Sequence, residues 1–412
     1  MQFNFSFYSS LLLVFLVHLL VYSGMCLRRY LKDGYASDGW LGIFLLLSFL
    51  YVCPWMLGFA GWYNQQPYRD IMFYVPFQHL FFLGPVMFFY VLSLLNPGFR
   101  FRKKYHIHFL PGLLYIAYSL FMFIYDRFIY KGYYFLQDGQ DRDFDEWYQA
   151  AGFISMLVYF ITALRYYNAY RKVTLNYLSN ADAFSFVWIR NFLTAVVFIF
   201  CAWLVLEIYS LIFDANYIDN WWYFIVFALL NYYIAIEGYT NTERSVLHFE
   251  GWTLGRIKNI GVLNNRQPAL RGVVSSALLD YVPHESQDEI TKEHTTEDFD
   301  EDIIMLNKMM KQERWYENPE LSLPELAHCM KLNIHYLSRL INKGVNLNFN
   351  DYINKYRIEA VIDKFKNGEH KESTFIGIAI DCGFNSKATF NRAFKKHTGT
   401  TPKEYVTRLV LV

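Results

Sequence analysis

Two short segments near the C-terminus carry polar and basic side chains at spacings that collect them on one face of a helix. In NIHYLSRLINK (333–343) the apolar positions share one face, which leaves outside His335, Ser338, Arg339 and Asn342. In SKATFNRAFKKH (386–397) the two phenylalanines share the inner face, which leaves outside Lys387, Asn391, Arg392, Lys395 and Lys396. Such rows of hydrogen-bond donors and cations suit contact with a nucleic acid.

Each of these segments follows a shorter helix and a tight turn. Residues 322–330 begin with Ser322 as an N-cap and end at a turn formed by Lys331-Leu332, after which Asn333 caps the next helix. Residues 374–382 end at Gly383-Phe384, where glycine suits a left-handed residue, and Asn385 or Ser386 caps the following helix. Two short helices around a tight turn, repeated about 50 residues later, predict two helix-turn-helix units.

Two longer helices are predicted around these units. Residues 349–365 read as one helix with an inward stripe at Phe349, Ile353, Tyr356 and Ala360, which would fix the two units relative to each other. Another helix begins near Phe299 and ends in the region of Pro319. The C-terminal domain is therefore expected to be all-α.

The order of these landmarks resembles the DNA-binding domain of the AraC/XylS family of bacterial transcription regulators. The resemblance covers roughly residues 305–408 and rests on SLPELA, YLSRLINK, NDYINKYRIEA and IAIDCGFNSKATFNRAFKKHTGTTPKEY. The sequence departs from the family at Lys331, where the family often has glycine in the first turn. That departure concerns the geometry of the first unit and not its existence.

The resemblance implies that both second helices enter successive major grooves on one face of double-stranded promoter DNA. Arg reads guanine and Asn reads adenine through paired hydrogen bonds. The residues it implies as base-facing are His335, Ser338, Arg339, Lys387, Ala388, Asn391 and Arg392. The residues expected to contact phosphates are Asn333, Lys343, Lys395, Lys396 and Thr401. For each lysine, a role as a solvated surface charge is as compatible with the sequence as a contact with DNA.

The first 240 residues have a different character. The whole chain is 54% hydrophobic and only 18% charged, and a bilayer core of ~30 Å needs about 20 mostly apolar residues per helix. Seven stretches qualify, and they predict a seven-helix transmembrane bundle: 7–27, 40–61, 71–95, 109–126, 149–167, 190–213 and 221–239. Glu207 lies deep in the sixth stretch and Glu237 near the inner end of the seventh, and each is either a functional group or a neutral residue that hydrogen-bonds helices together.

Basic residues predict the orientation of the bundle. The first, third and fifth connections, counted together with the ends of the spans beside them, hold eleven Lys and Arg, whereas the second, fourth and sixth hold four. The positive-inside rule then places the N-terminus outside and residue 240 onward in the cytoplasm. We expect a multi-pass protein of the bacterial inner (cytoplasmic) membrane, with its DNA-binding domain in the cytoplasm.

The charge of the remaining chain changes sign along its length. Residues 280–320 carry a net charge of −9 and residues 321–412 a net charge of +6. The predicted domains are therefore 1–240, the transmembrane bundle; 241–298, a cytoplasmic acidic connector; and 299–412, the DNA-binding domain. The acidic stretch is expected to be a solvated spacer, and the alternative is that it competes with DNA for the basic domain.

These features favour a membrane-anchored one-component transcription regulator over an enzyme. The five cysteines are scattered without zinc spacing, no catalytic motif is present, and neither a metal nor a cofactor is expected. The alternative is a transporter or membrane enzyme that carries a regulatory DNA-binding tail. The expected partners are promoter DNA and the lipid bilayer, together with an unknown small-molecule or membrane signal. A homodimer is compatible with this architecture but not required by it.

Overall fold

The computed structural model describes residues 5–77, 79–136, 142–210, 217–241, 247–250, 258–262 and 298–410. These residues are predominantly helical, which confirms the expected all-α class. One small departure is a two-stranded sheet formed by β1 (Leu247–Glu250) and β2 (Lys258–Val262) in the connector. The acidic stretch up to residue 297 lies outside the described residues. The chain forms two compact units, 1–168 with 186–259 and 169–185 with 260–412.

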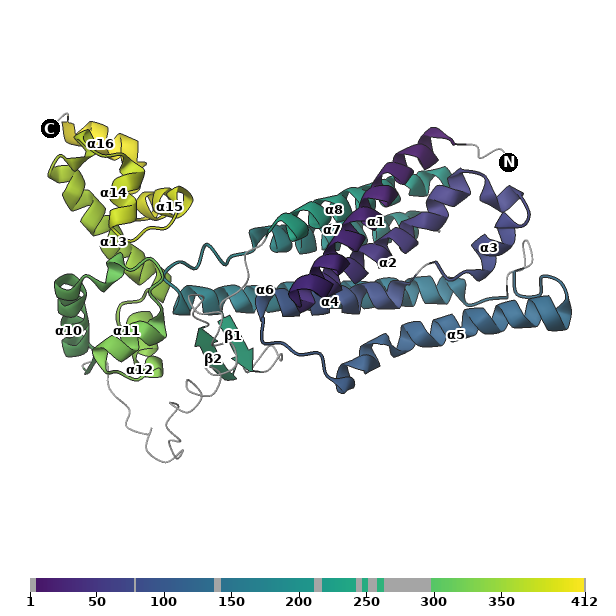
Figure 1. The fold of residues 1–412 in the computed structure, drawn as a ribbon, viewed down its shortest axis with the longest axis horizontal. Helices are drawn as coiled ribbons and strands as arrows, with labels where there is room; N and C mark the ends of the chain where they lie inside the picture. The colour runs from purple at the N-terminus through teal and green to yellow at the C-terminus, as the bar shows by residue number, and fades with distance from the viewer. Residues whose placement is uncertain are drawn as a thin grey trace, which may run out of the picture. The chain divides into compact units, whose positions relative to one another are not determined.

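The first unit is built from long apolar helices (Figure 1). The principal helices are α1 (Phe7–Asp33), α2 (Ala36–Phe59), α3 (Tyr68–Tyr74), α4 (Leu80–Leu95), α5 (Leu110–Ile124), α6 (Asp145–Tyr177), α7 (Val187–Ser210) and α8 (Trp221–Thr240). Short helical turns accompany them at η1 (Trp62–Asn64), η2 (Lys103–Phe109), η3 (Tyr125–Tyr130) and η4 (Tyr217–Asn220). The last turns of α6 belong to the second unit.

Five helical stretches among the described residues are long and apolar enough to cross a membrane. They are Phe7–Asp33, Ala36–Phe59, Lys103–Tyr130, Trp147–Tyr177 and Val187–Leu204. The predicted span 71–95 is divided instead, because Pro76 disfavours a helical conformation at Val75, and only the shorter apolar helix Leu80–Leu95 remains. The predicted segment 221–239 coincides with α8, in which Asn231 and Glu237 dilute the apolar residues.

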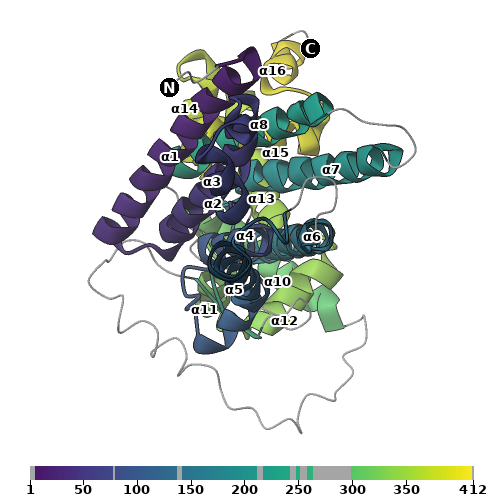
Figure 2. The same cartoon turned by 90° about the vertical axis from the view of Figure 1, so that its right-hand side faces the viewer.

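Close packing between helices, and the hydrogen bonds of one arginine, hold the helices of this unit together. Helices α4, α5 and α6 run alongside one another and are seen nearly end-on in Figure 2. A Cβ on Gly152 of α6 would lie 2.5 Å from Leu80 Cβ, so glycine permits α6 to approach α4. Arg29 of α1 donates two hydrogen bonds to Asp38 of α2, at 2.9 and 2.7 Å, and one to the carbonyl oxygen of Tyr239 in α8 at 2.6 Å. These hydrogen bonds join three helices.

The second unit contains the two predicted helix-turn-helix units. Its elements are α10 (Asp298–Glu313), η6 (Trp315–Glu317), α11 (Leu323–Met330), α12 (Ile334–Arg339), η7 (Leu340–Gly344), α13 (Phe349–Lys366), η8 (Glu369–Lys371), α14 (Phe375–Asp381), α15 (Lys387–Thr398) and α16 (Pro402–Val410). Ser322, Asn333 and Ser386 each cap a helix with their side chains, as the sequence predicts. Of the two alternatives for the last cap, the structure selects Ser386.

This unit has two hydrophobic cores that share one helix. The first core includes Leu306, Leu326, Leu337 and Ile353, and the second includes Ile358, Ile378, Phe390 and Phe394. The N-terminal part of α13 packs into the first core and its C-terminal part into the second, as the path of the helix in Figure 1 shows. Helix α13 is thus the spacer that the sequence predicts.

The turns of both helix-turn-helix units use a left-handed residue. Lys331 adopts φ +56° and still allows the Leu332 N–H to donate to the carbonyl oxygen of Ala327 at 2.9 Å. The first turn therefore keeps its geometry without glycine. Gly383 adopts φ +93°, and a Cβ there would lie 2.4 Å from the carbonyl oxygen of Tyr316. Glycine is required at Gly383 by its conformation and by the approach of backbone.

We predict that Gly383→Ala destabilises the C-terminal domain by roughly 3 kcal/mol, since the left-handed conformation and the clash with Tyr316 both oppose a side chain. The matched control is Gly399→Ala, where φ is +77° but no atom lies within 4 Å of the added Cβ; it should cost only about 1 kcal/mol. Pulse proteolysis of the full chain in urea measures both losses. Equal losses would contradict the role assigned to the Tyr316 contact.

Candidate nucleic-acid interface

We call the outward polar faces of α12 and α15, which the sequence predicts to contact DNA, the recognition faces. That of the first unit lies on α12. Asn333 accepts hydrogen bonds from the backbone N–H groups of His335 and Tyr336, at 2.8 and 3.4 Å, and so begins the helix. Leu337 is fully buried, whereas His335 and Arg339 are exposed and Ser338 is half-buried. Ser338 Oγ accepts a hydrogen bond from Asn342 at 3.2 Å. The helix therefore presents the polar face that the sequence predicts.

The recognition face of the second unit lies on α15. Ser386 Oγ accepts from the Thr389 N–H at 3.1 Å, and Phe390 and Phe394 anchor the helix in the second core. The side chains predicted to face bases are all exposed: Lys387, Ala388, Asn391 and Arg392. The burial of the phenylalanines orients this row outward.

The predicted phosphate contacts fall into two groups. Lys343 and Lys395 are exposed, and Lys396 is exposed but donates to Asp351 Oδ2 at 2.7 Å. Asn333 and Thr401 instead have local structural roles, because Asn333 caps α12 and Thr401 exchanges hydrogen bonds with Glu404 at the start of α16. A capping side chain can still donate or expose its backbone near a phosphate, so the assignment stays a prediction.

A buried arginine lies at the centre of the domain and was not singled out from the sequence. Arg357 of α13 is 1% exposed. Its guanidinium donates to the carbonyl oxygens of Tyr316 and Asn318, both at 2.8 Å, and to Asn354 Oδ1 at 3.4 Å. Burial lowers its pKa to about 9, so the group is still charged at neutral pH. The sequence does contain a signal for the burial of Arg357, because this residue directly follows Tyr356 and lies four residues after Ile353 on the buried side of α13.

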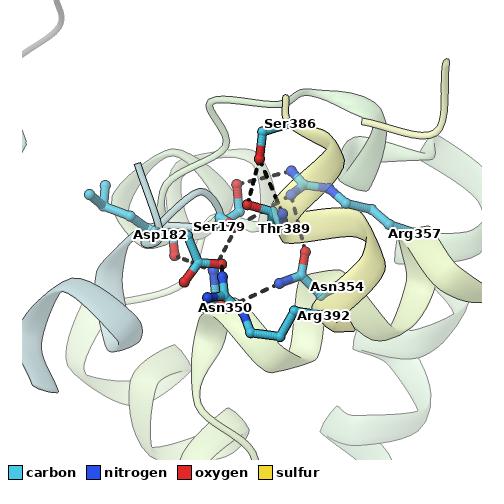
Figure 3. A network of polar contacts seen from close by, with 9 residues as sticks. Ser179, Asp182, Asn350, Asn354, Arg357, Ser386, Thr389 and Arg392 are labelled. Atoms are coloured by element: carbon cyan, nitrogen blue, oxygen red, sulfur yellow. Dashed lines mark hydrogen bonds and ion pairs between the residues drawn. The ribbon is translucent and has the colours of Figure 1, made fainter. Parts of the chain in front are cut away.

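The remaining partner of Arg357 comes from the connection between α6 and α7. Ser179 Oγ accepts from Arg357 Nη2 at 3.0 Å and the Ser179 carbonyl accepts from Nη1 at 3.3 Å (Figure 3). All five N–H donors of the guanidinium are thereby matched by an acceptor. We call residues 178–185 the docking segment. Helical periodicity gave no signal for this contact.

Asp182 of the docking segment pairs with Arg392, the predicted base-reading arginine of α15 (Figure 3). The Arg392 side chain is 58% exposed and that of Asp182 is 17% exposed. Partial burial lowers the pKa of Arg392, and the positive charge of Arg171, near the end of α6, lowers it further. The docking segment thus changes the electrostatic surroundings of a residue on the recognition face.

The two intramembrane candidates lie on different helices of the first unit. Glu207 belongs to α7, and its side chain lies outside what the structure describes. Glu237 is half-buried in the last turn of α8. Among the described residues no group of three or more His, Cys, Asp or Glu is arranged to hold a metal ion.

Comparison with known proteins identifies the second unit. Residues 326–408 match the sequence profile of a helix-turn-helix domain family. The transcriptional activator RhaS of Mannheimia succiniciproducens is 33% identical over 94 residues, and the probable transcription factor PqrA of Proteus vulgaris is 28% identical over 97 residues. Residues 326–408 are an AraC-type helix-turn-helix domain. Domains of this kind bind double-stranded DNA, and the recognition faces on α12 and α15 belong to it.

Each of these relatives matches only part of this chain. The similarity covers 22% of this chain with RhaS and with PqrA, and 34% and 77% of those proteins. A further transcriptional regulator of Staphylococcus aureus (strain COL) is 34% identical over 87 residues, which are 21% of this chain and 11% of that protein. A solved structure of a protein of unknown function from Listeria innocua is 30% identical and covers 26% of this chain and 96% of its own, with a TM-score of 0.22.

We predict that Arg357→Met destabilises the C-terminal domain by about 3 kcal/mol, because several buried acceptors lose their donor at once. The buried thiol of Cys382 reports unfolding of this domain when the other four cysteines, Cys26, Cys53, Cys201 and Cys329, are replaced by alanine. The reactivity of this thiol toward a thiol reagent is measured in the full chain at increasing urea concentrations. Arg408→Met, at an exposed arginine, is the control, and a midpoint equal to that of this control would refute the role of Arg357.

Proposed function

We propose that the chain is a membrane-anchored one-component transcription regulator that binds promoter DNA sequence-specifically. The single observation that carries the proposal is the pair of exposed polar helices, α12 and α15, each anchored in its own core and joined by α13. A helix of this kind enters the major groove with its polar face toward the bases. Two of them on one domain suit two successive grooves.

The base-facing assignments come from the resemblance to AraC/XylS-type domains, and the exposure and chemistry of most of these residues support them. Arg339 and Arg392 carry planar guanidinium groups, which suit the two acceptors of guanine, and Asn391 suits adenine. His335, Ser338, Lys387 and Ala388 complete the two rows. Lys343, Lys395 and Lys396, with Asn333 and Thr401, are proposed to contact phosphates, which would fix the position of the domain on DNA.

The first unit is proposed to anchor the domain in the bacterial inner membrane and to receive the signal. Five apolar stretches among the described residues are long enough to cross a bilayer, and the predicted orientation puts the DNA-binding domain in the cytoplasm. A ligand or a membrane change that favours one of two arrangements of the bundle would alter DNA binding. Glu207 and Glu237 are the proposed polar residues of that bundle. The proposed domains keep the boundaries 1–240, 241–298 and 299–412.

We predict different consequences for the two classes of contact. Arg339→Ala should weaken binding to a selected DNA duplex by about 1–3 kcal/mol and relax specificity at one position. Lys343→Ala should weaken binding to the selected and to scrambled duplexes by the same factor. It should also reduce the slope of log affinity against log salt concentration by about 1. Titrations of the full chain in nanodiscs at several salt concentrations separate the two. An identical pattern for both variants would contradict the assignment.

We predict that genome-wide crosslinking of the tagged full chain in its host recovers a small set of promoters. The Arg339→Ala/Arg392→Ala double variant should lose them, because each helix-turn-helix unit loses its guanine-reading group. Lys366→Ala, at an exposed lysine of α13 outside both faces, controls for the loss of charge and should retain them. Recovery of the same promoters by the double variant would refute sequence-specific binding through these faces.

A further inference from the structure

The docking segment is part of the surface of the DNA-binding domain, although it connects two apolar helices of the first half of the chain. Its first four residues are almost completely buried: Leu178, Ser179, Asn180 and Ala181 are 2%, 0%, 8% and 4% exposed. The Ser179 N–H donates to the carbonyl oxygen of Leu321 at 3.0 Å, and Leu178 forms an antiparallel bridge with Ser322. Backbone pairing therefore joins the segment to the residues that begin the first helix-turn-helix unit.

Side chains of α13 also hold the docking segment. Asn350 Nδ2 donates to the Ser179 carbonyl oxygen at 2.8 Å and to that of Leu178 at 3.5 Å. Arg357 adds its two hydrogen bonds to Ser179. Because the backbone and side chain of Ser179 accept hydrogen bonds from these buried donors, the start of the docking segment has a defined position. That position determines where the residues after Ser179 lie.

The residue placed in this way is Asp182, which pairs with Arg392. A carboxylate at that position opposes DNA in two ways. It occupies the guanidinium that is proposed to read a base, and it sets a negative charge where phosphates approach. The Arg392 side chain of this pair is more than half exposed, so DNA can compete with Asp182 for its guanidinium.

We propose that the docking segment is an intramolecular brake on DNA binding, in which Asp182 must leave Arg392 before the second helix-turn-helix unit reads DNA. The inference rests on the proposed function. The segment connects α6 to α7, so a rearrangement of either helix reaches Asp182 through the chain itself. Ser179 serves as the anchor of the segment and Asp182 as its inhibitory group.

The test compares the wild-type full chain in nanodiscs with Asp182→Asn, which removes the charge and keeps the shape. Each of the two proteins is used to select tightly bound sequences from a library of random duplexes. We call the most enriched sequence the winning duplex, and the affinities for it and for a scrambled duplex are then measured. Asp182→Asn should bind the winning duplex roughly two- to fivefold more tightly than the wild type. The gain should vanish in the Arg392→Ala background, because the pair no longer exists there.

Asp363→Asn, at an exposed carboxylate of α13, is the matched control for a loss of negative charge. Protection of the Cys382 thiol verifies that each variant is folded. Equal affinity of Asp182→Asn and Asp363→Asn would overturn the brake while the proposed function stands. Selection of no duplex by any folded variant would instead refute the proposed function. A winning duplex for Asp182→Asn alone would support the brake.

Discussion

The C-terminal domain depends on the buried guanidinium of Arg357, which has no carboxylate partner among the residues that the structure describes. A desolvated charge is costly, and only a full set of acceptors offsets that cost. Arg357 obtains this set from three places in the chain: the backbone before the first helix-turn-helix unit, Asn354 on its own helix, and Ser179 of the docking segment. Three segments that are distant in sequence are thereby held at one point.

This point lies where the orientation of the two helix-turn-helix units is set. Each unit has its own core, and α13 contributes to both. Reading two grooves with two helices requires a fixed geometry between them. Arg357 also contacts the ring of Phe384, which directly follows the Gly383 turn, at 5.8 Å from the ring centroid. The same side chain therefore links the spacer helix to the second turn, to the first unit and to the docking segment.

Much of this domain could be predicted because its signals are local. Caps, turns and buried faces repeat at fixed spacings, and Ser322, Asn333 and Gly383 have the expected roles. The contact between Ser179 and Arg357 could not be predicted in this way, because it joins residues 178 positions apart and has no periodic signature. The division of 71–95 had a local signal in Pro76, which was outweighed by the apolar run around it.

The two parts of the docking segment differ in the energy they contribute. An ion pair with a solvent-exposed arginine, such as Asp182–Arg392, is worth about 0–1 kcal/mol, whereas loss of acceptors from a buried charged donor costs about 1–3 kcal/mol for each group left unmatched. Release of Asp182 therefore requires little energy, while release of Ser179 would disturb the whole domain. A signal that favours one arrangement by about 1.4 kcal/mol changes an equilibrium tenfold. That energy is enough to separate the ion pair but smaller than the cost of losing several buried hydrogen bonds at once, so the anchor can stay in place while the inhibitory group moves.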